Sequence, residues 1–211
     1  NNLDHISAIH PYSTGKFMII DSSTRRNLEL VETMREKQKR GSLLWVLDKT
    51  KTAMGARLLR SYVEQPLIDK TEIEKRQDAI ADINKHMITR EELREYLNPI
   101  YDLERLITRV TYLSANPRDL IAFKNSIGML PPIKSLLDDF DTELLKEIQA
   151  DMDALEELYQ LINESIIEEP PISVREGGLI KDGYNKNVDT YRHAKTEGKT
   201  WLAELEAKER E

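Results

Sequence analysis

The sequence predicts a mainly α-helical fold: an irregular multi-helix bundle, a long helix that protrudes from it at the C-terminal end, and one or two short β-strands near the N-terminus. Leu and Ile together number 46 against 6 Val, and Gly and Pro together contribute only 16 of the 211 residues. Leu, Glu, Lys and Arg are favourable in helices, and few turn-forming residues imply few hairpins. Apolar residues that recur at spacings of three, four and seven support the same class.

The first half of the chain contains four predicted elements. Over residues 16–30, two short apolar runs flank a Ser/Thr-rich turn, which predicts one or two short strands. One apolar stripe predicts a single helix over about residues 42–64, ending before Pro66. Thr71 and Thr89 are each followed three residues later by Glu, so we expect each to begin a helix with a capping box.

The second half predicts longer helices. A helix over residues 103–110 precedes one that Asn116 caps and Pro117 opens. Another runs from Asp141 to Ile162. After a short extended segment over 172–183, a helical pattern continues from residue 184 to 211, which would reach about 42 Å. No stop signal follows Gly198, so we expect this helix to continue in a longer parent protein.

Charge and composition exclude several classes of protein. The chain has no cysteine, which excludes disulfides, thiolate zinc sites and a cysteine nucleophile. No apolar run reaches the roughly 18–20 residues that span a bilayer, so we expect no membrane association. The net charge is −7, yet residues 1–70 carry 12 basic and 8 acidic side chains, whereas residues 132–169 carry 2 and 12. The acidic stretch would repel a DNA backbone.

The sequence contains no complete catalytic, cofactor or metal motif. Gly198, Lys199 and Thr200 resemble the end of a phosphate loop, but His193 stands where that motif needs glycine. The four histidines do not have the spacing of metal ligands. We therefore expect no catalytic residue, metal or cofactor in this chain, although an enzyme with an unrecognised site stays open as a third class of function.

Several blocks of sequence together resemble one family. Residues 21–30 are similar to its D-x-x-T-R-R-N-L-E-L signature, and residues 41–67 to the block that follows. Further blocks at residues 102–106, 115–120 and 176–184 follow in the family's order and spacing. The family is the bacterial DNA mismatch-repair ATPase MutS.

The resemblance implies a particular part of that family, the helical core and lever domain. Residues 1–183 would form the core domain, and residues 184–211 the start of the outgoing lever helix, cut before the DNA-gripping clamp. The family's mismatch-reading Phe-x-Glu wedge does not occur in the chain. The resemblance therefore carries over no DNA-reading or nucleotide-binding residue.

The function that the resemblance implies belongs mainly to the parent protein, an ATP-dependent mismatch-binding protein. The parent would use ATP and Mg, bind mismatched duplex DNA through its other domains, form homodimers and engage a MutL-type repair partner. It would be cytoplasmic and associated with the nucleoid when bound to DNA. This fragment would have no chemistry of its own and would couple the ATPase end to the clamp end.

Two groups of residues are candidates for this role. The first, in the signature block, would make structural or inter-domain contacts and comprises Asp21, Thr24, Arg25, Arg26 and Asn27. The second would pack the lever helix and comprises Val188, Tyr191, Trp201, Leu202 and Leu205. An alternative function is weak, non-specific DNA binding by a helical module that uses the basic residues within 25–60.

Overall fold

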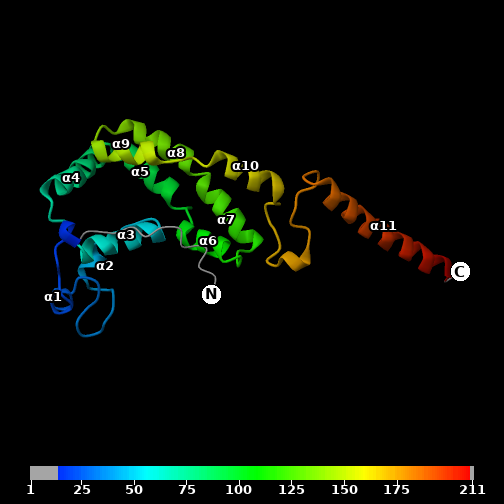
Figure 1. The fold of residues 1–211 in the computed structure, drawn as a ribbon, viewed down its shortest axis with the longest axis horizontal. Coiled ribbons are helices and arrows are strands. Elements are labelled where there is room, and N and C mark those ends of the chain that lie inside the picture. Colours follow the sequence, from blue (N-terminus) through cyan, green and yellow to red (C-terminus); the bar gives the residue numbers. More distant parts are fainter. Residues whose placement is uncertain (1–13, 210–211) are drawn as a thin grey trace. The chain divides into compact units, whose positions relative to one another are not determined.

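Helices form most of the structure, as the composition predicts (Figure 1). The computed structural model describes the backbone of residues 14–209 and the side chains of residues 15–200 and 208. The elements in order are η1 (Thr14–Lys16), α1 (Ser22–Asn27), α2 (Leu43–Leu47), α3 (Ala53–Glu64), α4 (Lys70–Lys85), α5 (Met87–Leu97), α6 (Leu103–Thr111), α7 (Pro117–Ile127), α8 (Leu130–Leu136), η2 (Leu137–Asp139), α9 (Glu143–Asp151), α10 (Glu156–Ser165), η3 (Val174–Glu176) and α11 (Lys186–Glu209).

The chain divides into two units. The first comprises the described residues up to Ala115 together with Asn125–Leu155, and the second comprises Asn116–Lys124 and the residues from Glu156 onward. Helix α7 therefore contributes residues to both units. The domain boundary expected between residues 183 and 184 stays a prediction.

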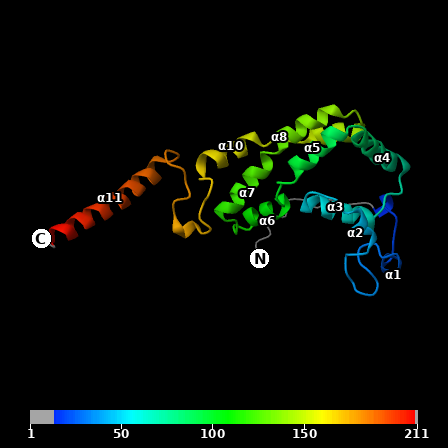
Figure 2. The ribbon, with the colours of Figure 1, turned by 180° about the vertical axis from the view of Figure 1, so that it is seen from behind.

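Four helices surround the apolar core of the first unit. Helices α4, α5, α8 and α9 lie side by side in both views (Figures 1 and 2). Phe140, just before α9, is fully buried and packs with Ala79, Leu137 and Leu145. The ring of His86 meets Phe140 edge-on, with ring centroids 5.4 Å apart. Phe140 therefore joins side chains from α4, η2 and α9.

A buried carboxylate fixes the start of α9. Helix α9 has no side-chain cap from its own Thr142, but the Asp82 carboxylate of α4 accepts the backbone N–H groups of Asp141 at 2.9 Å and Thr142 at 3.2 Å. The pKa of the Asp82 carboxyl lies below its ordinary value of 3.8. The hydrogen bond from the Asp141 N–H is the largest cause of this lowering, and burial acts in the opposite direction. Asp82 thus caps a helix that lies about sixty residues away in sequence.

An arginine joins α3 to the start of α6. The guanidinium of Arg57 makes a two-pronged ion pair with the Asp102 carboxylate, with both N–O distances at 2.7 Å, and also pairs with Glu104. Asp102 also caps α6 by accepting the backbone N–H of Arg105 at 3.3 Å. The Asp102 carboxylate therefore both caps the start of α6 and holds Arg57 of α3 beside it.

The short strands expected over residues 16–30 are not formed, and that prediction is wrong. The described part of this segment contains one isolated antiparallel bridge between Phe17 and Leu67, followed by helix α1. Asp21 accepts hydrogen bonds from the backbone N–H and the hydroxyl of Thr24, at 2.8 and 3.0 Å, and so caps α1. The Ser/Thr run is therefore a helical turn and not the tip of a hairpin.

Two helices expected to be continuous are interrupted. Residues 42–64 form α2 and α3, because Asp48 accepts the N–H and hydroxyl of Thr50 and Thr52 starts α3 by accepting the N–H of Gly55. Residues 141–162 form α9 and the first part of α10, because Asp153 accepts the N–H of Leu155, whose φ is +53°. Side chains that hydrogen-bond their own backbone end each helix.

The expected caps are confirmed in one place and wrong in two. Asn116 accepts the N–H of Asp119 at 2.9 Å and Pro117 opens α7, as predicted. Helix α4 is instead capped by Asp69, two residues before Thr71, and α5 begins at Met87 without a side-chain cap. Thr89 is the third residue of α5, and its hydroxyl donates to Asp139 at 2.6 Å instead of capping the helix.

We predict that Phe140→Ala lowers the free energy of unfolding by about 3–5 kcal/mol, because it leaves a cavity in a fully buried site. Urea unfolding followed by circular dichroism measures the change. Ile88→Ala is the matched control, because Ile88 is 78% exposed and its loss should change stability by less than about 0.5 kcal/mol. Equal effects of the two substitutions would contradict this description of the core.

We also predict a pH-dependent effect of Asp82→Asn. Because the folded pKa of Asp82 lies below 3.8, its carboxylate stabilises the fold above that pH, and this stability is lost as the pH falls through the folded pKa. The wild-type chain should therefore unfold at a higher temperature than the variant at pH 7. The difference should shrink as the pH falls below about 3.8, and a constant difference across this range would refute the assignment.

Candidate functional site

The first turn of the long helix α11 is fixed by side chains on both sides of its start. Asn185 accepts the backbone N–H groups of Asn187 and Val188, at 3.0 and 3.3 Å. Asp189, inside the helix, accepts the backbone N–H of Gly183 at 3.0 Å. Gly183 has a φ of +83°, a conformation that other residues adopt with strain. We call residues 180–192 the root of α11.

Arg192 ties this root together. Its Nη2 donates to the backbone carbonyl of Ile180 at 2.9 Å, and its Nη1 forms ion pairs with Asp182 and, at 3.7 Å, with Asp189. Arg192 lies on α11, whereas Ile180 and Asp182 precede the helix. A planar guanidinium that holds three acceptors restrains the direction in which the helix leaves the preceding segment.

The segment before the root is in turn attached to α10. Ile166 and Ile180 form an isolated antiparallel bridge, with the Ile167 N–H bonded to the Leu179 carbonyl at 3.0 Å and the Lys181 N–H to the Ser165 carbonyl at 2.9 Å. The Lys181 ammonium also donates to the backbone carbonyl of Asn163 at 2.5 Å. Three hydrogen bonds therefore hold the root against the end of α10.

Helix α7 contacts the same elements. Its Lys124 ammonium donates to the side-chain oxygen of Asn163 at 3.3 Å, and its Arg118 Nε donates to the Pro170 carbonyl at 3.0 Å. A cavity of about 340 Å³ lies beside this second contact, lined by Arg118, Ile121, Glu168, Glu169 and Pro170. Contacts thus run without a break from α7 through α10 to α11.

The residues expected to pack the long helix are only partly described. Val188 is half-buried, whereas Tyr191 is 76% exposed. Trp201, Leu202 and Leu205 lie on α11, but their side chains are outside the described residues. In both views no other helix of the second unit runs beside α11 (Figures 1 and 2). The packing role of these residues stays a prediction.

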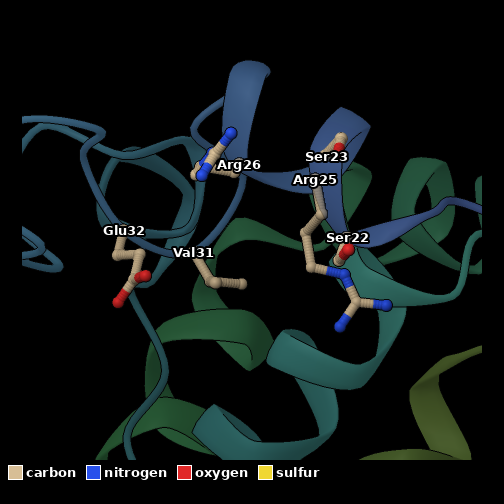
Figure 3. Close-up of a pocket in the computed structure, with 6 residues that line it drawn as sticks. All are labelled: Ser22, Ser23, Arg25, Arg26, Val31 and Glu32. Carbon is tan, nitrogen blue, oxygen red and sulfur yellow. The ribbon is translucent and has the colours of Figure 1, made fainter.

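The signature residues form helix α1 and its cap in the first unit. A cavity of about 290 Å³ lies there, and the residues that line it, drawn in Figure 3, are Ser22, Ser23, Arg25, Arg26, Val31 and Glu32. Asp21 and Thr24 form the cap of α1, and the pKa of Asp21 is lowered chiefly by the N–H of Thr24. The cavity is therefore built on a capped helical turn.

The two arginines of the signature differ in their contacts. Arg25 lies 3.8 Å from Glu64, and its Nε is buried without a hydrogen-bond partner within the described chain. Arg26 is exposed and points away from Arg25 in the close-up (Figure 3), and Asn27 is exposed too. The structure therefore places the five signature residues together, and their role in contacts between domains stays a prediction.

The described residues offer no candidate for a metal site or for a membrane-spanning helix. No group of three or more His, Asp or Glu side chains there could hold a metal ion. No helix in that part of the chain is long and apolar enough to cross a bilayer.

Comparison with known proteins identifies the family. The family model described as MutS domain III matches residues 23–211. Proteins named "DNA mismatch repair protein MutS" are similar to the chain: that of Lachnoclostridium phytofermentans is 66% identical over the whole chain and 23% of its own length, and that of Ruminiclostridium cellulolyticum is 53% identical over the whole chain and 24% of its own length. That of Clostridium novyi is 50% identical over 99% of the chain and 23% of its own length. The chain thus spans about a quarter of the curated relatives it matches, and it belongs to the MutS domain III family of DNA mismatch-repair proteins.

Proposed function

We propose that this chain is the core and lever domain through which a mismatch-repair ATPase couples its ATPase end to its DNA-clamp end. The observation that carries the proposal is the root of α11, where Arg192 holds the helix to the Ile180–Asp182 segment. A domain that transmits motion needs an element with two arrangements whose equilibrium both sites can bias. The contacts that link α7, α10 and α11 support the proposal that these helices move together.

The length of α11 makes its root mechanically important. The helix has 24 residues, which corresponds to about 36 Å. A small rotation at the root therefore becomes a much larger displacement at the far end. The helix can transmit that rotation only if the hydrogen bonds at its root stay formed. Those bonds are made by Arg192, Asp189 and Asn185.

The remaining properties are proposed for the full-length protein. It would hydrolyse ATP with Mg, bind mismatched duplex DNA through other domains, form homodimers and recruit a MutL-type partner. It would act in the bacterial cytoplasm, associated with the nucleoid while bound to DNA. The core and lever domain itself would contribute coupling and no chemical step.

A second candidate function is weak DNA binding by the basic residues within 25–60. Within the described chain, six of them form no ion pair: Arg26, Arg35, Lys37, Arg40, Lys49 and Lys51. Such side chains are available to phosphates, but the acidic stretch over residues 132–169 opposes binding. This observation is weaker support than the continuous contacts at the root.

A gel shift of the purified chain with duplex DNA at low salt separates the two functions. The coupling proposal predicts no retarded band, because the acidic stretch repels the duplex. Retardation that weakens steeply with added salt, and that is lost in a Lys49→Glu/Lys51→Glu variant, would favour the second candidate instead.

The coupling proposal predicts a specific defect in Arg192→Ala. The experiment places this chain in the Lachnoclostridium phytofermentans protein, in place of its matching segment. ATP hydrolysis and DNA affinity, measured separately, should stay near wild type. The change in DNA affinity that ATP causes should fall by about tenfold, because the root no longer transmits motion.

Arg175→Ala is the matched control for this experiment. Arg175 lies in η3 of the same unit, and its side chain forms no ion pair with the described residues. Its replacement should leave the effect of ATP on DNA affinity unchanged. If Arg192→Ala behaves like Arg175→Ala, coupling does not pass through the root of α11.

A further inference from the structure

Two lysines share one neutral residue beside the root of α11. The Lys124 ammonium contacts the side-chain oxygen of Asn163 at 3.3 Å, and the Lys181 ammonium contacts the backbone oxygen of Asn163 at 2.5 Å. Neither lysine forms an ion pair with any acidic side chain in the part of the chain that the structure describes. Two ammonium groups therefore contact the same neutral residue, and neither is paired with a carboxylate of the described chain.

The burial of Lys124 makes this arrangement unusual. Lys124 is only 6% exposed. Buried lysines are rare unless an opposite charge accompanies them, because removing an ammonium from water costs several kcal/mol. An ammonium has three N–H donors, and the neutral oxygen of Asn163 accepts only one of them. The site therefore has unused donors and uncompensated charge.

We propose that Lys124, Lys181 and Asn163 form a binding site for one carboxylate side chain, supplied by an acidic segment of the full-length protein outside these 211 residues. Lys181 is half-buried, so the site is open on its side. The relatives are about four times as long as the matched segment, which leaves ample chain to supply an acidic residue.

Local charge favours a single carboxylate over a nucleic acid. Glu164, Glu168 and Glu169 are exposed on the same unit and belong to the stretch with 12 acidic and 2 basic residues. A polyanion would bring many phosphates against these glutamates. One Asp or Glu side chain can reach the two ammonium groups without that repulsion.

The occupied site would strengthen the joint that the proposed function uses, and in this respect the inference rests on that function. Lys124 belongs to α7, Asn163 to α10 and Lys181 to the segment that Arg192 ties to α11. A carboxylate between the ammonium groups would link all three elements by charge-assisted hydrogen bonds. Binding of the acidic segment would thereby set how firmly the root is held.

The first test introduces a negative charge at position 163 of this chain. Asn163→Asp replaces the amide that the Lys124 ammonium contacts with a carboxylate of the same shape, so the melting temperature of the 211-residue chain at pH 7 should rise by about 2–4 °C. The rise should disappear in the Lys124→Met background, whereas Lys134→Met should preserve it, because the Lys134 ammonium bonds the Met152 carbonyl elsewhere. A fall, no change, or an equal rise without Lys124 would overturn the proposed site.

The second test identifies the occupant. The Lachnoclostridium phytofermentans protein that carries this chain in place of its matching segment is treated with a carbodiimide, which joins a contacting amine and carboxylate. The linked peptides are then identified by mass spectrometry. Lys181 should be linked to an Asp or Glu outside the 211 residues of the same polypeptide. Lys181→Arg, which keeps the charge but removes the reactive amine, should lose this link.

Mixing isotopically light and heavy protein shows whether a link joins two copies. A link between copies, a link only within the 211 residues, or no link at Lys181 would overturn the proposed occupant. These results do not depend on the effect of Arg192→Ala on coupling, so the inference can fail while the proposed function stands.

Discussion

The guanidinium of Arg192 is the contact on which the long helix depends. It bonds the Ile180 carbonyl and pairs with Asp182 and Asp189, so that α11 and the segment before it share one set of hydrogen bonds. Without it, Asp189 would still accept the Gly183 N–H, and the bridge at Ile166 and Ile180 would still join the preceding segment to the end of α10. Within the described residues, these contacts of Arg192 and the bond from the Gly183 N–H to Asp189 join α11 to the segment that precedes it.

Carboxylates that bond to backbone N–H groups organise the rest of the chain. Asp21 starts α1, Asp82 starts α9 from another helix, and Asp153 separates α9 from α10. The ammonium of Lys39, and then Thr50, lower the pKa of Asp48 to about 2, so the turn between α2 and α3 keeps its charge well into acid. The ends of these helices are therefore set by side chains that bond the backbone, and not by propensity alone.

The sequence predicted the helical class, the helix that opens at Asn116 and Pro117, and the long terminal helix, because apolar periodicity and local caps are visible in a single chain. It did not predict the interruptions at Asp48 and Asp153, where a local side-chain bond outweighs a continuous apolar stripe. The sequence also did not predict the contacts at the root of α11. Asp189 and Arg192 have a helical ion-pair spacing, but no pattern links Lys124 to Asn163, 39 residues away.

The most direct measurement of the central claim is the distance distribution between α10 and α11. The chain contains no cysteine, so spin labels can be attached at Glu157→Cys and Glu197→Cys alone, both exposed positions of the second unit. Pulsed electron paramagnetic resonance should give a single narrow distribution that broadens markedly in the Arg192→Ala background and not in Arg175→Ala. Equally narrow distributions in both backgrounds would contradict the claim that Arg192 holds the root of the helix.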